Sequence, residues 1–145
     1  MRINYLAVVA SAAAYWVLGA VWYGVFSGPF VALMRWTPED VARVEAGGAG
    51  LQVAVAFLCS LVLAYVLAHF VKFTGAESAW QGAQAGFWLW LGFVATTNLN
   101  TVLFEFRPLG LYLINNGYHL VAMLGMGALL AVWKRREARA PAYQH

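Results

Sequence analysis

The stretch LQVAVAFLCSLVLAYVLAHFV, residues 51–71, decides the fold class of this protein. It is apolar over almost its whole length and contains no Asp, Glu, Lys or Arg. A helix needs about 20 such residues to cross the hydrocarbon core of a bilayer, which is about 30 Å thick. Because the run is continuous and does not alternate, it indicates a helix and not a strand of a membrane barrel. We therefore expect residues 51–71 to span a membrane.

Three further stretches have the same character, at residues 4–26, 80–104 and 109–133. None of them contains a charged side chain. The first is longer than the 7–15-residue apolar core of a signal peptide, so we interpret it as an uncleaved helix. The sequence thus predicts an all-α fold, a polytopic transmembrane four-helix bundle. Residues 1–133 would form this single domain, and residues 134–145 a basic cytoplasmic tail.

The composition supports a membrane location. Of the 145 residues, 63% are hydrophobic and only 10% are charged, and the mean hydropathy is +0.67. A soluble domain has about 25% charged residues, so the excess apolar surface here must face lipid. The net charge of +3 is concentrated in KRREAR at 134–139, without the aromatic-interleaved basic surface of a nucleic-acid-binding protein. We expect the lipid bilayer as partner and no nucleic acid.

Lysines and arginines predict the orientation, because cytoplasmic loops carry an excess of them. In a four-span arrangement, six lie on the side of both termini and three on the other side, at Arg35, Arg43 and Arg107. Both termini are therefore expected in the cytoplasm, with the chain in the cytoplasmic (inner) membrane. Interfacial aromatic residues are expected at the inner side (Tyr5, Trp80, Trp133) and at the outer side (Trp22, Tyr23, Tyr112).

The connection between the first two spans carries a helix start. In TPED, residues 37–40, Thr37 is placed as the N-cap, Pro38 follows at the first helical position, and the acids occupy the first turn. GGAG at 47–50 would end the helix. We expect a short interfacial helix on the outer membrane surface, and the alternative of a solvated linker stays open. The apolar side chains just before it would dip into lipid: Phe30, Leu33, Met34 and Trp36.

Polar side chains crowd the end of the third span, in TTNLNTVLFE at 96–105. At 100° per residue, one arc of this helix carries Thr97, Asn98, Thr101 and Glu105. The fourth span carries a matching face with Tyr112, Asn115 and His119. The short turn EFRPLG at 105–110 makes the two helices antiparallel neighbours, so their polar faces should meet. An unpaired amide in hydrocarbon costs several kcal/mol.

The candidate site is this polar cluster, which comprises Thr97, Asn98, Thr101, Glu105, Arg107, Asn115 and His119. It is either a hydrogen-bonded network that holds the helices together or an outward-open cavity for a polar solute or ion. His119 is expected to be neutral and bonded to Asn115 or a threonine, although intramembrane ionisable groups are functional candidates. Glu105 and Arg107 would form an exposed ion pair, unless Glu105 turns inward to form a proton-linked pair with His119.

The sequence gives little support for a catalytic, metal or cofactor site. No phosphate-binding loop, catalytic motif, paired carboxylates or metal-ligating cluster is present in the sequence, so we expect no enzyme, metal or cofactor. The single cysteine, Cys59, excludes an intrachain disulfide. Small residues in GAQAG at 82–86, together with Gly117, Gly125 and Gly127, favour close helix packing, within the bundle or between subunits.

Three segments carry a resemblance to a known family: LGAVWYGVF at 18–26, WLGFVATTNLNTVLFEFRPLGLYLINNGYHLV at 90–121, and MGALLAVW at 126–133. The chain resembles the bacterial membrane proteins grouped as domain of unknown function 1761. The resemblance implies a small four-helix membrane protein and brings no established activity. It also implies that the family pattern includes Glu105, Arg107, Pro108, Asn115 and Tyr118.

These observations favour a non-enzymatic membrane protein, either a structural or a partner-binding subunit. The alternative is a small oligomeric channel or carrier for an ion or small polar solute. A homo-oligomer or a membrane-protein partner is compatible with both.

Overall fold

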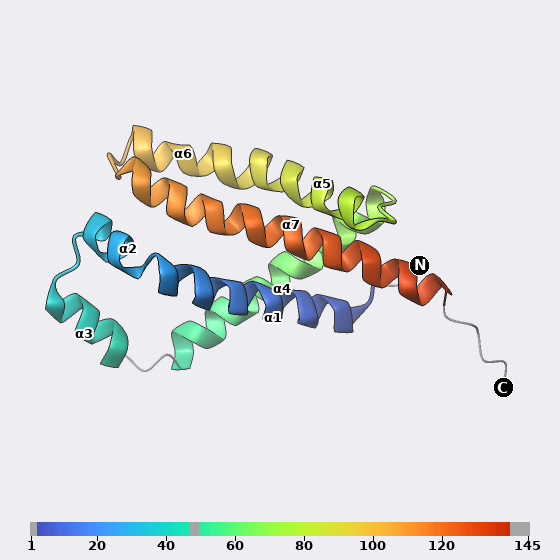
Figure 1. Cartoon of the computed structure of the whole chain (residues 1–145), viewed down its shortest axis with the longest axis horizontal. Coiled ribbons are helices and arrows are strands. Elements are labelled where there is room, and N and C mark those ends of the chain that lie inside the picture. The colour runs from blue at the N-terminus through green and yellow to red at the C-terminus, as the bar shows by residue number, and fades with distance from the viewer. Residues whose placement is uncertain (1–2, 47–49, 140–145) are drawn as a thin grey trace.

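The computed structural model describes residues 3–46 and 50–139, with side chains as far as Trp133. The chain is all-α in these segments, as the sequence predicts, and Figure 1 shows helices packed side by side along the long axis. The helices are α1 (Tyr5–Val25), α2 (Ser27–Met34), α3 (Pro38–Ala46), α4 (Gly50–Phe73), α5 (Ala79–Trp90), α6 (Thr96–Leu103) and α7 (Leu109–Arg139), with a π-helical segment, η1 (Leu91–Ala95), between α5 and α6.

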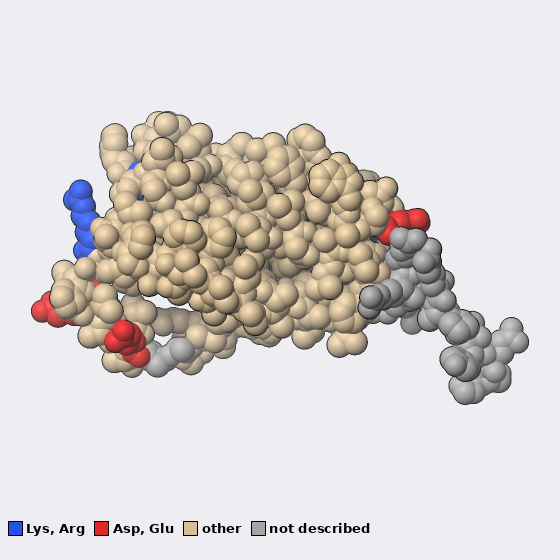
Figure 2. All heavy atoms as spheres, in the orientation of Figure 1, with Lys and Arg blue, Asp and Glu red and all other residues tan. Residues whose placement is uncertain are grey.

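Three helices are long and apolar enough to cross a membrane: Tyr5–Val25, Gly50–Phe73 and Leu109–Trp133. The protein is therefore a multi-pass membrane protein. Figure 2 shows the corresponding surface, with charged side chains gathered at the two ends and none visible along the middle. The predicted tail from residue 134 begins as a continuation of α7 to Arg139, and residues 140–145 lie outside the described part.

The predicted span at 80–104 differs from the other three. It is divided into α5, η1 and α6, and none of these segments alone reaches the length of a span. The division falls where the sequence turns polar, because η1 ends at Ala95 and the threonines and asparagines follow it. The three segments nevertheless follow one another in line along α7 (Figure 1).

Helices α5 and α7 approach so closely that their backbones touch. A Cβ atom added to Gly82 would collide with the carbonyl oxygen of Gly127, and one added to Gly86 with the carbonyl oxygen of Met123. The small residues of GAQAG therefore serve packing within the chain. Gly125, by contrast, has open space where its Cβ would be.

The apolar core lies toward the end of the molecule where α1 begins and α4 and α7 reach their last turns. Its buried residues come from these three helices and the residue Ala76, and they include Val8, Ala12, Ala64, Leu67, Val71, Met123, Met126 and Leu130. Most are small or medium-sized, which lets the helix backbones approach. At the opposite end, α4 diverges from α1, and residues 51–56 of α4 are exposed.

The connection between α1 and α4 is helical, and its second half begins as the sequence predicts. The backbone N–H of Asp40 donates to Thr37 Oγ1 at 3.2 Å, and Thr37 N donates to the Asp40 carboxylate at 2.9 Å. This reciprocal cap starts α3 directly before Pro38. The hydrogen bond from the Thr37 backbone, followed by the one from its hydroxyl, holds the pKa of Asp40 below its usual value.

The residues before α3 form a helix that the sequence does not predict. Residues 27–34 form α2, in which Phe30, Val31, Leu33 and Met34 are half-buried, whereas Pro29 and Ala32 are exposed. The Phe30 ring packs edge-on against both Tyr23 and Trp36, at centroid distances of 5.4 and 5.6 Å. Leu33 contacts Gly110 at the start of α7. These contacts tie α2 to the bundle, and the expectation that its apolar side chains dip into lipid stays a prediction.

Candidate functional site

The polar cluster forms where α6 and α7 meet. The turn between them reverses the chain within a few residues: Phe106 adopts a positive φ of 53°, and the backbone N–H of Arg107 donates to the Thr101 carbonyl at 3.1 Å. Pro108 precedes α7 and its carbonyl accepts hydrogen bonds from the first turn of that helix. The two helices are therefore antiparallel neighbours, as the short connection predicts.

A small polar pocket of about 140 Å³ lies between these helices. Four of the seven predicted residues line it, namely Asn98, Thr101, Arg107 and Asn115. The lining is completed by Leu111, Tyr112 and Asn116. The prediction that polar faces of the two helices meet is thus supported for these residues.

The asparagines of the pocket are hydrogen-bonded to neighbouring helices. Asn98 donates from Nδ2 to Asn116 Oδ1 at 3.1 Å, and Asn116 donates to the Tyr112 carbonyl at 2.9 Å. Asn115 accepts a 2.8 Å hydrogen bond from the Tyr23 hydroxyl, which reaches it from α1. Asn116 is 4% exposed, so it is the most deeply buried amide of the pocket. These bonds link α1, α6 and α7.

Three polar residues of the patch point away from the pocket. Thr96, Thr97 and Asn100 are exposed on the surface of the chain. Thr97 is predicted to belong to the polar cluster, but it does not line the pocket. The hydroxyls of Thr96 and Thr97 donate to carbonyls one turn earlier, those of Gly92 and Phe93, each at 2.7 Å. Both hydroxyls are thereby satisfied within their own helix, as is that of Thr101, which lines the pocket and donates to the Asn98 carbonyl at 2.7 Å.

Glu105 does not turn inward. Its carboxylate accepts a 2.9 Å hydrogen bond from Arg107 Nε, and both side chains are about half exposed, at 54% and 53%. This is the exposed ion pair that the sequence favoured, and such pairs contribute about 0–1 kcal/mol. A proton-linked pair between Glu105 and His119 is therefore contradicted by the structure.

His119 faces a different helix from the one expected. Its Nδ1 lies 3.2 Å from the Tyr15 hydroxyl on α1, and it contacts neither Asn115 nor a threonine by a hydrogen bond in the described segments. The neighbouring Tyr118 donates to the Tyr15 carbonyl at 2.9 Å. His119 and Tyr118 thus fasten α7 to α1.

Several aromatic residues that sequence reasoning placed at the membrane interface are hydrogen-bond donors inside the bundle. Trp22 Nε1 donates to the Ile114 carbonyl at 3.0 Å, and Tyr112 donates to the carbonyl of Ala95, the last residue of η1, at 2.8 Å. Trp90, which is not among the predicted interfacial residues, likewise donates from Nε1 to the Asn116 carbonyl at 2.9 Å. The sequence feature that indicates these contacts is a Trp or Tyr within an apolar helix. The polar atom of such a ring can bond a buried carbonyl as well as lie at the membrane interface.

The arrangement offers hydrogen bonds and one exposed ion pair, and no cluster of three or more His, Cys, Asp or Glu side chains occurs in the part of the chain that the structure describes. His69, on α4, bonds through Nδ1 to the Tyr65 carbonyl at 2.9 Å. The chemistry within reach of the site is therefore the pairing of amides, hydroxyls and indoles with backbone carbonyls across helices.

Comparison with known proteins supports the resemblance read from the sequence. Residues 6–131 match the family described as "Protein of unknown function (DUF1761)". No curated protein and no solved structure gives a significant match. Because the match covers all four predicted spans except the first residues of one and the last residues of another, the chain belongs to the DUF1761 family.

Proposed function

We propose that this protein is a four-span membrane protein of the bacterial inner membrane that acts as a non-enzymatic structural or partner-binding subunit. In this proposal α5, η1 and α6 together form the third span, in addition to the spans formed by α1, α4 and α7. Residues 79–103 follow one another in helical conformation, and at 1.5 Å per residue they extend about 37 Å, enough for a core of about 30 Å.

The observation that carries the proposal is the pairing of the buried amides. Asn98 and Asn116 bond to each other, and Asn115 bonds to Tyr23, so the amides are engaged in holding helices together. An interhelical hydrogen bond in a membrane contributes roughly 0.6–2 kcal/mol. A transport site, in contrast, would keep polar groups free to replace the water around a solute.

The uncovered face of α4 supports a partner-binding role. Of the three candidate spans, α4 has the smallest buried share, and its exposed residues are large and apolar. They include Leu58, Val62 and Val66, which lie at helical spacing. Such a face is suited to lipid or to the span of another membrane protein.

One observation favours a second candidate, a small channel or carrier that functions as an oligomer. The polar pocket of about 140 Å³ has room for about four waters, at about 30 Å³ each, and Arg107 lies at its edge. A hydrated pocket between α6 and α7 would be the outer vestibule of such a protein.

Cysteine accessibility distinguishes these two candidates. Single cysteines replace Asn98, Thr101 or Asn115 in a Cys59→Ala background, and intact cells are treated with a membrane-impermeant maleimide. A cysteine at the exposed Glu39 of α3 is the positive control, and one at the buried Ala122 of α7 is the negative control. We expect labelling close to that of the Ala122 variant. Labelling as fast as that of the Glu39 variant at all three positions would favour the channel or carrier.

A further inference from the structure

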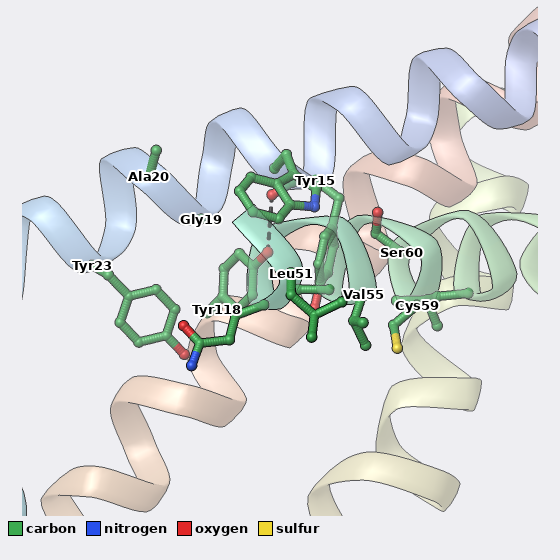
Figure 3. A pocket seen from close by; sticks show the side chains of 13 residues that line it. Tyr15, Gly19, Ala20, Tyr23, Leu51, Val55, Cys59, Ser60 and Tyr118 are labelled. Carbon is green, nitrogen blue, oxygen red and sulfur yellow. Dashed lines mark hydrogen bonds between the residues drawn. The ribbon is translucent and has the colours of Figure 1, made fainter. Parts of the chain in front are cut away.

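A large apolar crevice lies between α1, α4 and α7, apart from the polar pocket. Its volume is about 840 Å³. Figure 3 shows its walls, where side chains of α1 and α4 face a common space beside Tyr118 of α7. Its lining comprises Tyr15, Trp16, Gly19, Ala20, Tyr23, Leu51, Gln52, Val55, Ala56, Cys59, Ser60, Leu63 and Tyr118.

The crevice arises from how α4 crosses α1. Near the core, small residues such as Ala12 and Ala64 are completely buried, and the two helices are close. Toward the start of α4 the helices diverge, and among the described residues no other helix fills the space that opens between them. Residues 51–56 of α4 are all exposed, although they belong to a membrane span.

Most of the polar groups on the walls are already engaged in hydrogen bonds. The Tyr118 hydroxyl donates to the Tyr15 carbonyl, the Tyr23 hydroxyl donates to Asn115, and Ser60 donates to the Phe57 carbonyl at 2.7 Å. The Tyr15 hydroxyl lies 3.2 Å from His119 Nδ1. The crevice therefore presents mainly hydrocarbon and ring faces, and its occupant should be a hydrocarbon chain and not a polar solute.

The length of the crevice indicates which hydrocarbon. Its α4 wall runs from Leu51 to Leu63, which at 1.5 Å per residue is about 18 Å. One leaflet contributes about half of the 30 Å hydrocarbon core, or about 15 Å. The crevice thus extends through about one leaflet, starting at the end of the molecule where α2 and α3 lie.

A polar side chain lies at the end of the crevice where α4 begins, at the depth expected for the ester groups of a lipid. Gln52 lines the crevice one residue from the end of its α4 wall. Within the described residues, no hydrogen bond is found for its side-chain amide, and the same holds for the indole of Trp16 and the thiol of Cys59. An amide at this position is suited to the ester and phosphate oxygens of a lipid. The crevice opens between two apolar spans, so a lipid chain reaches it directly from the bilayer.

We propose that the crevice binds one acyl chain of a phospholipid from the leaflet on the α2–α3 side, with the glycerol ester region at Gln52. Its volume is within the range of about 300–1,000 Å³ typical of ligand sites. This inference does not depend on the function proposed for the polar cluster, because the two sites share no lining residue.

The first test uses a variant that fills the crevice. The purified protein is reconstituted into phosphatidylglycerol vesicles that contain a phospholipid with a diazirine in one acyl chain, and cross-linked peptides are mapped after irradiation. We expect cross-links at Cys59 and Leu63 several-fold above those at Leu58 and Val62, which are exposed on α4 outside the crevice.

Ala56→Phe should remove this excess of cross-links at Cys59 and Leu63. Ala54→Phe, exposed on the same helix and outside the crevice, should keep it.

Two results of this experiment would overturn the proposal. Equal cross-linking at all four positions, unchanged by Ala56→Phe, would mean that the crevice holds only bulk lipid. Cross-linking that is low at Cys59 and Leu63 in a protein that migrates as a dimer would mean that a second copy of the chain fills the space.

A second test needs no filling variant and covers the case in which Ala56→Phe does not fold. The rate at which N-ethylmaleimide alkylates Cys59 is measured in detergent, before and after phosphatidylglycerol is added to delipidated protein. We expect a several-fold slower reaction with lipid. A cysteine at Leu58 in a Cys59→Ala background should show little change, and equal slowing at both positions would contradict a specific site.

Discussion

At the scale of single residues, the polar patch divides according to the helix face on which each side chain lies. Thr96 and Thr97 are exposed and donate to carbonyls one turn earlier, but Thr101, which lines the pocket, also donates to a carbonyl of its own helix. Asn98 bonds Asn116 across two helices, whereas Asn100 is exposed. Residue type alone therefore does not explain the division between the pocket and the surface.

Asn116 and Asn100 form a matched pair that tests this account. Asn116→Ala removes the interhelical acceptor of Asn98 and a donor to the Tyr112 carbonyl within α7, so we expect the free energy of unfolding to fall by roughly 0.6–2 kcal/mol for the lost interhelical bond. Asn100 is exposed and its side chain has no hydrogen bond among the described residues, so Asn100→Ala should change stability by less than about 0.5 kcal/mol. Unfolding by SDS in mixed micelles measures both. Equal losses would contradict the pairing.

At the scale of the elements, the close contact of α5 with α7 depends on glycine. Gly82 and Gly127 each lie against the other's carbonyl oxygen, and Gly86 lies against that of Met123. Because the neighbouring atoms belong to a helix backbone, they cannot move aside as a flexible side chain can. The π-helical segment η1 follows this contact, and Tyr112 of α7 donates to its last carbonyl. Insertions of this kind occur frequently at functional sites.

Glycine substitutions test the α5–α7 contact. Gly86→Ala should destabilise the protein by about 1–3 kcal/mol, because the added methyl group forces the two backbones apart. Gly125→Ala, on α7 with open space around it, should be neutral or stabilising by up to about 1 kcal/mol, because alanine favours a helix. The apparent melting temperature in detergent measures the difference. A gain in stability from Gly86→Ala would refute the close approach.

At the scale of the whole molecule, the number of spans determines on which side the C-terminus lies. If α5, η1 and α6 cross the bilayer together, both termini share one side, and the distribution of lysine and arginine makes that side cytoplasmic. If these segments stay at one surface, only the three long apolar helices cross, and the C-terminus lies opposite the N-terminus.

Reporter fusions decide between these arrangements. Alkaline phosphatase, active outside the cytoplasm, and a fluorescent protein, active inside it, are fused after Arg43, Gly75 and Phe106 and at the C-terminus. We expect phosphatase activity after Arg43 and Phe106, and fluorescence after Gly75 and at the C-terminus. Fluorescence after Phe106 together with phosphatase activity at the C-terminus would establish three spans and contradict the four-span proposal.

The sequence by itself determined the fold class, the positions of the long apolar helices, the cap that starts α3 and the antiparallel turn before α7. These features depend on the residues of one short segment, namely its hydropathy, its capping residue or its proline. It also predicted that Asn98, Thr101, Arg107 and Asn115 come together, because a short turn places two helix faces at matching depth.

Only the tertiary structure decided which helices the remaining polar atoms contact. His119 pairs with Tyr15, and Asn115 with Tyr23, across more than 90 residues of sequence. The crevice between α1 and α4 likewise depends on the angle at which two helices cross. Periodicity shows which face of a helix is polar, but the rotation and crossing of packed helices are set by the close contact of small residues on all of them at once.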